Sequence, residues 1–240
     1  MNQSNEFDDF AKDYQGHINE ALGPLGGDVA YYVGRKVQIL RKLISDQSVE
    51  RVLDYGCGIG QAVPFLKNAF NPAILIGSDL SSASVDFAIR QYPYLLYRHP
   101  EELEDNSFDL IFVSNVMHHI DPTERSKVVQ DLCKKLRPGG KIAIFEHNPF
   151  NFVTRIVVSN CVFDEGVQLL SKSRVRQTLR SSGIIENLES GYCLFVPERL
   201  RKLNWLEDKF RYIPLGGQHF TIGSKKLDSN KSASVHVHDN

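Results

Sequence analysis

The chain has 240 residues, of which 42% are hydrophobic and 24% charged, and its formal net charge is -1 at pH 7. These values predict one soluble globular domain with a sizeable core. A nearly neutral chain has no overall field that attracts nucleic acid, so we expect no nucleic-acid partner. No apolar run is long enough to predict stable membrane insertion.

The four cysteines lie far apart and include no Cys-x-x-Cys pair. This spacing argues against a zinc site and against a disulfide framework. The first residues are polar and acidic, unlike the basic and then apolar start of a secretory signal. Together these features predict a cytoplasmic protein with reduced thiols.

A glycine-rich turn follows the first predicted strand. The strand, Arg51 to Leu53, runs into Asp54 and then into Gly56, Gly58 and Gly60, and an amphipathic helix comes next. Glycine lets backbone approach a ligand closely, whereas the acid disfavours a phosphate and suits a positively charged ligand. The third glycine comes one residue earlier than in the dinucleotide fingerprint, which disfavours the alternative of an oxidoreductase with a nicotinamide cofactor.

The second predicted strand spans residues 73–78 and ends at Asp79, and Ser81 is a candidate N-cap for the helix that follows. A carboxylate at this point accepts hydrogen bonds from two hydroxyls of a ribose. The alternative is a charge that only complements the N-terminus of the helix.

Strands and helices continue to alternate along the chain. We expect strands over residues 94–97, 108–113 and 141–145, and a helix that begins near Pro122 and ends before residue 137. Such alternation is typical of an α/β protein with a doubly wound parallel sheet. Two further strands, over residues 184–196 and 218–222, are expected near the end.

The pattern Asp-x-Gly-x-Gly-x-Gly resembles the first motif of the class I S-adenosylmethionine-dependent methyltransferases. Asp79 and residues 106–112 and 136–141 resemble later landmarks of that family, so the resemblance covers roughly residues 48–147. It implies S-adenosyl-L-methionine as cofactor. It also implies a Rossmann-like, seven-stranded, mostly parallel sheet with an antiparallel last strand and an N-terminal helical lid.

The resemblance also suggests a domain organisation. Residues 1–46 would form the helical lid, residues 47–224 the methyltransferase domain, and residues 225–240 a flexible tail. Residues 197–214 would be an insertion between the last two strands, with a substrate cover, a dimer contact and, least favoured, a membrane-surface helix as alternative uses. We expect a monomer or a homodimer.

In the family the glycine loop wraps the methionine part of the cofactor, and an aromatic residue of the lid lies nearby. The predicted cofactor-binding residues are Asp54, Gly56, Cys57, Gly58, Gly60, Asp79, Leu80, Asn115 and Tyr14. Tyr31 is a second candidate for the aromatic residue, although packing against the sheet explains either tyrosine as well. The adenine contact stays open between Glu101 and backbone or apolar groups.

Three histidines follow the fourth and fifth strands, at the edge where open α/β sheets bind ligands. We predict His118, His119 and His147 as catalytic residues, because removing a hydroxyl proton at neutral pH suits a histidine. A structural hydrogen-bonding role is the alternative for each. Glu146 is expected either to orient His147 or to bind a sugar hydroxyl. Some quinone O-methyltransferases hold a divalent metal with acids near this site. This chain has Asn115 and His118 in place of those acids, so no metal is expected.

The predicted activity is methyl transfer to a small-molecule acceptor, most readily a hydroxyl oxygen of a sugar or secondary metabolite. Residues 146–155, 163–165 and 169–171 resemble a bacterial subgroup of surface-polysaccharide and secondary-metabolite pathways. Transfer to nitrogen or carbon is one alternative. A non-catalytic cofactor-binding module of the same fold is the other.

Overall fold

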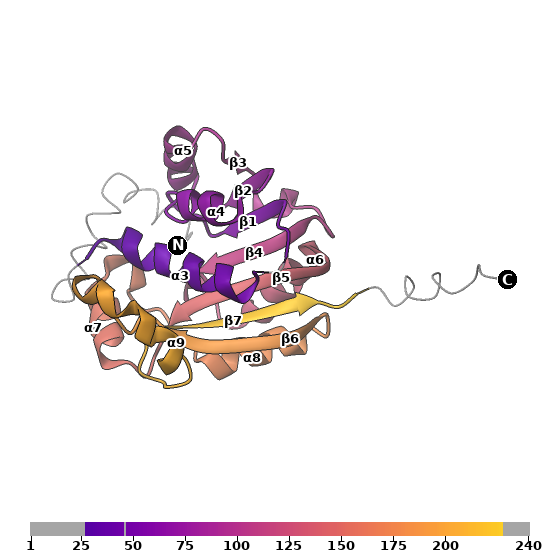
Figure 1. The fold of residues 1–240 in the computed structure, drawn as a ribbon. Helices are drawn as coiled ribbons and strands as arrows, with labels where there is room; N and C mark the ends of the chain where they lie inside the picture. Colours follow the sequence, from indigo (N-terminus) through magenta and orange to yellow (C-terminus); the bar gives the residue numbers. More distant parts are fainter. Residues whose placement is uncertain (1–26, 46, 228–240) are drawn as a thin grey trace.

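Seven strands form one sheet in the computed structural model, which describes residues 27–45 and 47–227. Their order across the sheet is β3-β2-β1-β4-β5-β7-β6 (Figure 1). The strands are β1 (Arg51–Tyr55), β2 (Ile74–Ser78), β3 (Leu96–Tyr97), β4 (Phe108–Ser114), β5 (Leu136–His147), β6 (Ile185–Cys193) and β7 (Gln218–Lys225). Strands β3, β2, β1, β4 and β5 pair with their neighbours in parallel. Strand β7 runs antiparallel to both β5 and β6. The Rossmann-like sheet with an antiparallel last strand is therefore confirmed.

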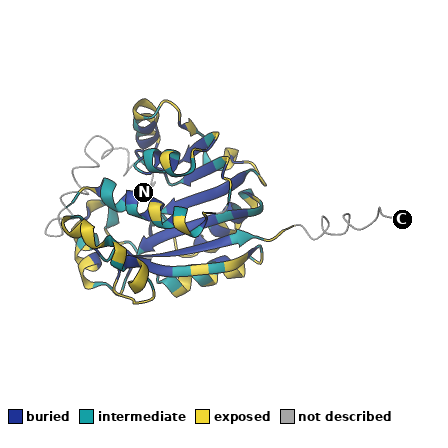
Figure 2. Cartoon of the chain, in the orientation of Figure 1, coloured by how far each residue is buried: buried dark blue, intermediate teal, exposed yellow. Residues whose placement is uncertain are grey.

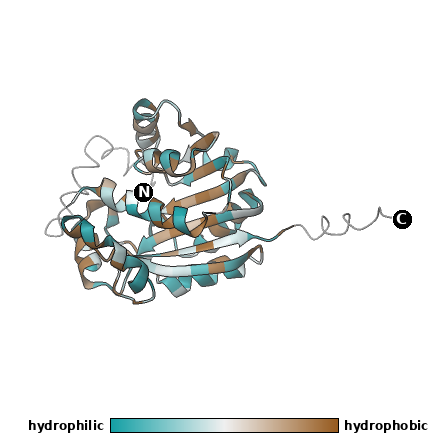
Figure 3. Cartoon of the chain, in the orientation of Figure 1, coloured by the Kyte–Doolittle hydropathy of each residue, from teal (hydrophilic) through white to brown (hydrophobic). Residues whose placement is uncertain are grey.

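Helices cover both faces of this sheet. The main helices are α3 (Val29–Leu43), α4 (Val63–Phe70), α5 (Ser82–Gln91), α6 (Arg125–Lys135), α7 (Phe152–Asn160) and α8 (Lys172–Ser181). Helices α3, α4 and α5 pack on one face, and α6 and α8 on the other, each with its own hydrophobic cluster. Figure 2 shows the central strand β4 as mostly buried, and Figure 3 shows it as mostly hydrophobic, whereas β6 near the sheet edge mixes buried with exposed and apolar with polar residues.

Short helical turns complete the described chain. They are η2 (Pro100–Glu102), η3 (Met117–His119), η4 (Val162–Asp164), η5 (Glu198–Leu206) and α9 (Glu207–Phe210). The last two fill the predicted insertion. Among the described residues, no helix combines the length and the apolar character needed to cross a membrane.

Helix α3 is the second helix of the predicted lid. Asp28 caps it by accepting a hydrogen bond from the backbone N–H of Ala30 at 3.0 Å. Its residues Val33, Val37 and Leu40 are buried in the core on one face of the sheet. This helix therefore packs as part of the sheet's own core. The rest of the predicted lid lies outside the described residues, as does most of the predicted tail, so the domain boundaries stay predictions.

Several boundaries differ from the sequence prediction, and two of the differences have a clear physical reason. Strand β5 already begins at Leu136, which pairs with Phe108 ahead of a bulge, whereas the prediction began this strand at residue 141. Helix α6 begins three residues after Pro122, because the carboxylate of Asp121 accepts the backbone N–H of Thr123 at 2.8 Å. Such a local turn delays the start of the helix.

Candidate active site

A pocket lies where β1, β4 and β5 end, and residues of α3 and α7 also line it. Figure 1 shows where these elements lie. Strands β4 and β5 deliver their last side chains to it because parallel strands end at the same edge of a sheet. Eight of the predicted site residues line it: Asp54, Gly56, Cys57, Gly58, Asn115, His118, His119 and His147.

The glycine loop forms one wall of this pocket. The backbone N–H groups of Gly56 and Cys57 donate to the carbonyl of Ser78 at 2.7 and 3.1 Å, which ties the loop to the end of β2. Gly58 has a φ of +49°, and a Cβ built there meets no protein atom within 4 Å. Its open face therefore offers bare backbone to a ligand, which is the property expected of a cofactor cradle.

Asp54 closes the inner end of the loop. Its side chain is buried, and Oδ2 has no hydrogen-bond partner among the residues that the structure describes. Burial and the nearby charge of Asp79 raise the pKa of Asp54 to about 7, although the Lys36 ammonium opposes this shift. An unpaired buried carboxylate that lines a pocket suits a cationic ligand group.

Three predicted cofactor residues do not line the pocket itself. Gly60 sits in the turn, where a Cβ would lie 3.0 Å from the ring of Tyr92, and Leu80 is exposed. The Asp79 carboxylate accepts the backbone N–H groups of Gly58 at 2.8 Å and Ser81 at 3.0 Å. Asp79 therefore holds the glycine loop, in addition to any contact with a ribose. Tyr14 lies outside the described residues.

His118, which lines the pocket, forms a buried pair with Glu146. Glu146 Oε2 lies 2.5 Å from His118 Nδ1, and Oε1 accepts the backbone N–H of Met117 at 2.8 Å. Burial lowers the pKa of His118, but the charges and hydrogen bonds of Glu146 and Asp164 outweigh burial and raise it. The expectation that Glu146 orients His147 is wrong, because neighbouring residues of a strand point to opposite faces of the sheet.

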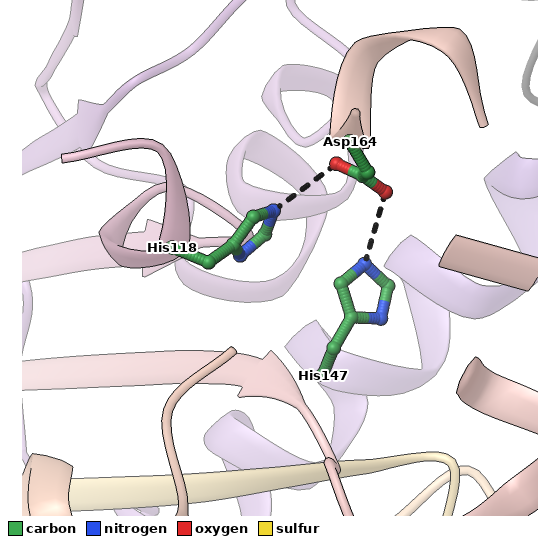
Figure 4. Close-up of side chains that lie close together, drawn as sticks. All are labelled: His118, His147 and Asp164. Carbon is green, nitrogen blue, oxygen red and sulfur yellow. Dashed lines mark hydrogen bonds and ion pairs between the residues drawn. The ribbon is translucent and has the colours of Figure 1, made fainter. Parts of the chain in front are cut away.

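Asp164 brings the three histidines together. It comes from η4, and its Oδ1 lies 3.3 Å from His118 Nε2 and 3.4 Å from His119 Nε2. Its Oδ2 lies 4.0 Å from His147 Nε2. Figure 4 shows Asp164 between His118 and His147. Burial and the neighbouring His118 both lower the pKa of His119 and of His147, so these two rings are neutral at pH 7.

Sequence reasoning missed three residues of this pocket. Asp164 lies in a segment that resembles the family, but it was not predicted as a site residue. Lys36 interrupts the apolar stripe of α3, and its helical spacing from Val33 and Leu40 indicates a buried position. Tyr32 lines the pocket, whereas the predicted Tyr31 donates from its hydroxyl to Asn204 Oδ1 at 2.8 Å.

Comparison with known proteins agrees with this geometry. Residues 53–144 match the family model of a methyltransferase domain. Two solved structures share the fold: one from Archaeoglobus fulgidus, a SAM-dependent methyltransferase, and one from Thermotoga maritima, described as a possible histamine N-methyltransferase. The first has a TM-score of 0.62 at 19% identity and covers 83% of this chain and 95% of its own. The second has a TM-score of 0.65 at 19% identity, with coverages of 93% and 100%.

Curated relatives match the central part of the chain. Trans-aconitate 2-methyltransferase of Deinococcus radiodurans is 30% identical over 107 residues, which is 44% of this chain and 41% of that protein. An uncharacterized methyltransferase of Synechocystis is 30% identical over 109 residues, or 43% and 50%. The chain thus spans half or less of the length of these relatives. Residues 53–144 are therefore a methyltransferase domain with the class I fold, and these similarities support S-adenosyl-L-methionine as the cofactor.

The residues of the pocket fit this cofactor. The unpaired buried oxygen of Asp54 matches the ammonium of the methionine part, and the open face of Gly58 leaves room for the ligand beside the loop. Asp54 and Gly58 both belong to the glycine-rich motif that resembles the family. The roles of the individual residues are predictions that the following two experiments test.

Cofactor affinity should fall on acidification below about pH 7. The Asp54 carboxyl has a pKa of about 7 with Asp79 and Lys36 as its charged neighbours, so acid protonates it and removes the partner of the cofactor ammonium. The dissociation constant should rise up to tenfold for each pH unit below that value. Calorimetry between pH 5.5 and 7.5 measures this slope. Asp54→Asn should bind more weakly with a flat profile, and a flat wild-type profile would contradict the assignment.

Replacing Asp79 by alanine should weaken cofactor binding by roughly 1–3 kcal/mol, the scale of lost charged hydrogen bonds. The loss has two sources, the ribose contact and the hold on the Gly58 amide. A cofactor analogue without the 2′-hydroxyl separates them in a double-mutant cycle. If Asp79 binds the ribose, wild type should lose affinity for the analogue and the variant should not. Equal losses in both proteins would restrict Asp79 to holding the loop.

Proposed function

We propose that the protein transfers the methyl group of S-adenosylmethionine to a hydroxyl oxygen of a small acceptor. The observation that carries this proposal is that the glycine loop and the His118–His119–His147 cluster line one pocket. A cofactor on the loop would therefore present its methyl group near proton-accepting side chains. Attack at a sulfonium methyl is a displacement that depends chiefly on positioning, so the remaining need of a hydroxyl is a base.

His119 is the base in this proposal. Both ring nitrogens of His118 already face carboxylates, and its side chain is 0% exposed, whereas the side chain of His119 is 22% exposed. One His119 nitrogen accepts the hydroxyl proton, and the Asp164 carboxylate stabilises the imidazolium that forms. The acceptor oxygen forms a bond to the methyl carbon, and the carbon–sulfur bond breaks with its electron pair left on sulfur. The products are a methyl ether and S-adenosylhomocysteine.

A small acceptor fits the far side of the pocket. Thr154 and Val157 from α7 and Phe163 from η4 supply this side, a mixture of apolar surface with one hydroxyl. The near-neutral charge of the chain supports a small acceptor over nucleic acid. A cytoplasmic location and a monomeric or dimeric state remain part of this proposal.

The test is a methyl-transfer screen with isotopically labelled cofactor. Three acceptor panels of similar size carry hydroxyl groups on sugars and phenols, amines, or carboxylates, and mass spectrometry detects the added methyl group. Methylation in the hydroxyl panel, with matching release of S-adenosylhomocysteine, is the expected result. Methylation only of amines or carboxylates would overturn the choice of oxygen acceptor. Cofactor binding without turnover in all three panels would favour a non-catalytic module.

A further inference from the structure

Three side chains in the pocket have the arrangement of metal ligands. One donor atom each from His118, His147 and Asp164 lies within 4.8 Å of the others. We propose that these residues bind a divalent transition-metal ion, with His118 Nε2, His147 Nε2 and one Asp164 oxygen as ligands. This departs from the expectation of no metal, which considered only Asn115 and His118 and missed Asp164.

The distances support this assignment. Two nitrogen or oxygen ligands, each about 2.1 Å from a tetrahedral ion, lie roughly 3.4 Å apart. His118 Nε2 lies 3.3 Å from Asp164 Oδ1, and His147 Nε2 lies 4.0 Å from Oδ2. The first pair has the ligand spacing already. The second pair involves the other oxygen of the same carboxylate and must approach by about 0.6 Å. Figure 4 shows both rings directed at the carboxylate that joins them.

The surroundings of His118 also match a metal ligand. Histidine ligands are commonly oriented by a carboxylate on the other ring nitrogen. Glu146 occupies that place, 2.5 Å from His118 Nδ1 and fully buried. With the proton held between Nδ1 and Glu146, the lone pair of Nε2 is directed toward Asp164 and the pocket.

His147 has a comparable partner in Gln218. The Gln218 amide lies 3.4 Å from His147 Nδ1, and its Oε1 has no hydrogen-bond partner within the described residues. Gln218 Nε2 also donates to Asn115 Oδ1 at 3.0 Å, so the amides of both residues must be turned over together. Asn115 Nδ2 then donates to Gln218 Oε1, which also accepts from His147 Nδ1–H and leaves the lone pair of Nε2 for the ion. Both histidines therefore have a group that sets the tautomer needed for ligation.

The ligand set selects the class of metal. Two imidazoles and one carboxylate suit zinc, iron or similar ions, while magnesium prefers an all-oxygen set. The three ligands leave positions open on the pocket side for water or an acceptor oxygen. That last role rests on the proposed function, whereas metal binding itself does not.

Zinc binding to the full chain tests the site without cofactor or acceptor. After treatment with EDTA and dialysis, calorimetry should show one Zn²⁺ per chain, and Zn²⁺ should raise the melting temperature. Asp164→Asn and His147→Ala should each weaken binding by more than roughly 100-fold, beyond the cost of losing an outer-shell partner. Glu146→Gln should weaken it by roughly 10–100-fold.

Control variants separate this site from other metal-binding groups. Asp208→Asn removes an exposed carboxylate elsewhere, and the double variant His236→Ala/His238→Ala removes the tail histidines, so both should bind Zn²⁺ like wild type. Cys161 also lines the pocket, so Co²⁺ substitution tests whether its thiolate is a ligand. Visible bands without a thiolate charge-transfer band are expected. Circular dichroism without metal verifies the fold of each variant.

The proposal fails on any of three results: no Zn²⁺ binding by wild type, equal affinity in the folded Asp164→Asn and His147→Ala variants, or a thiolate band with Co²⁺. None of these results depends on methyl transfer. A failed acceptor screen with intact zinc binding would instead count against the proposed function alone.

Discussion

Replacing Gly58 by valine should abolish measurable binding of S-adenosylmethionine while the protein stays folded. The Cβ at this position meets no protein atom within 4 Å, so the new side chain projects into the space beside the loop. We expect a dissociation constant raised more than roughly 100-fold, equivalent to about 2.8 kcal/mol. Calorimetry with S-adenosylmethionine and with S-adenosylhomocysteine measures the loss.

Backbone strain must be separated from loss of space, because Gly58 has a positive φ. Gly183→Val is a matched control: Gly183 has a φ of +70°, its Cβ also meets nothing within 4 Å, and it follows α8 away from the pocket. It should lower the melting temperature about as much and leave cofactor affinity unchanged. Near-normal affinity of a folded Gly58→Val protein would remove the cofactor from this side of the loop.

Gly56 should respond differently from Gly58. Its Cβ would lie 2.3 Å from Val116 Cγ2, so even alanine collides with the protein. Gly56→Ala should therefore lower stability, because overpacking of a buried contact typically costs about 1–3 kcal/mol. The two glycines of one motif thus have separate functions: Gly56 permits the packing of two loops, and Gly58 leaves space for the ligand.

Replacing His119 by alanine should lower turnover by roughly 10²–10⁴-fold with little change in cofactor affinity. The reason is that the partly exposed His119 is the proposed proton acceptor, whereas the cofactor is expected on the glycine loop. His119→Gln keeps a polar side chain of similar reach without a basic nitrogen and should be equally slow. Initial rates on an acceptor from the hydroxyl panel, together with the dissociation constant of the cofactor, measure both quantities.

His219→Ala is the comparison for a structural histidine. His219 is fully buried, and its Nε2 bonds to the carbonyl of Leu170 at 2.8 Å, so its loss should reduce stability. Near-normal turnover of His119→Ala would exclude His119 as the base. The His147 and His118 variants, made singly, would then show whether another ring of the cluster takes the proton or positioning alone suffices.

The sequence by itself was enough for the fold and for the loop. Asp54, the three glycines and Asp79 lie within one strand–loop–helix–strand segment, and their geometry depends on neighbours close in the chain. The alternation of strands and helices likewise predicted the sheet, because hydrophobic periodicity is a local signal. Most residues predicted for the site do line one pocket for the same reason: parallel strands bring their ends to one edge.

The partners of the histidines were decided only by the tertiary structure. Asp164 reaches the pocket because η4 packs over the sheet edge, a placement that no spacing in the sequence encodes. Glu146 pairs with His118 of η3, and its neighbour in the strand, His147, points to the opposite face. Local patterns thus determined which residues reach this edge of the sheet. Long-range packing determined which of them touch, because contacts between separate elements depend on how those elements are placed in space.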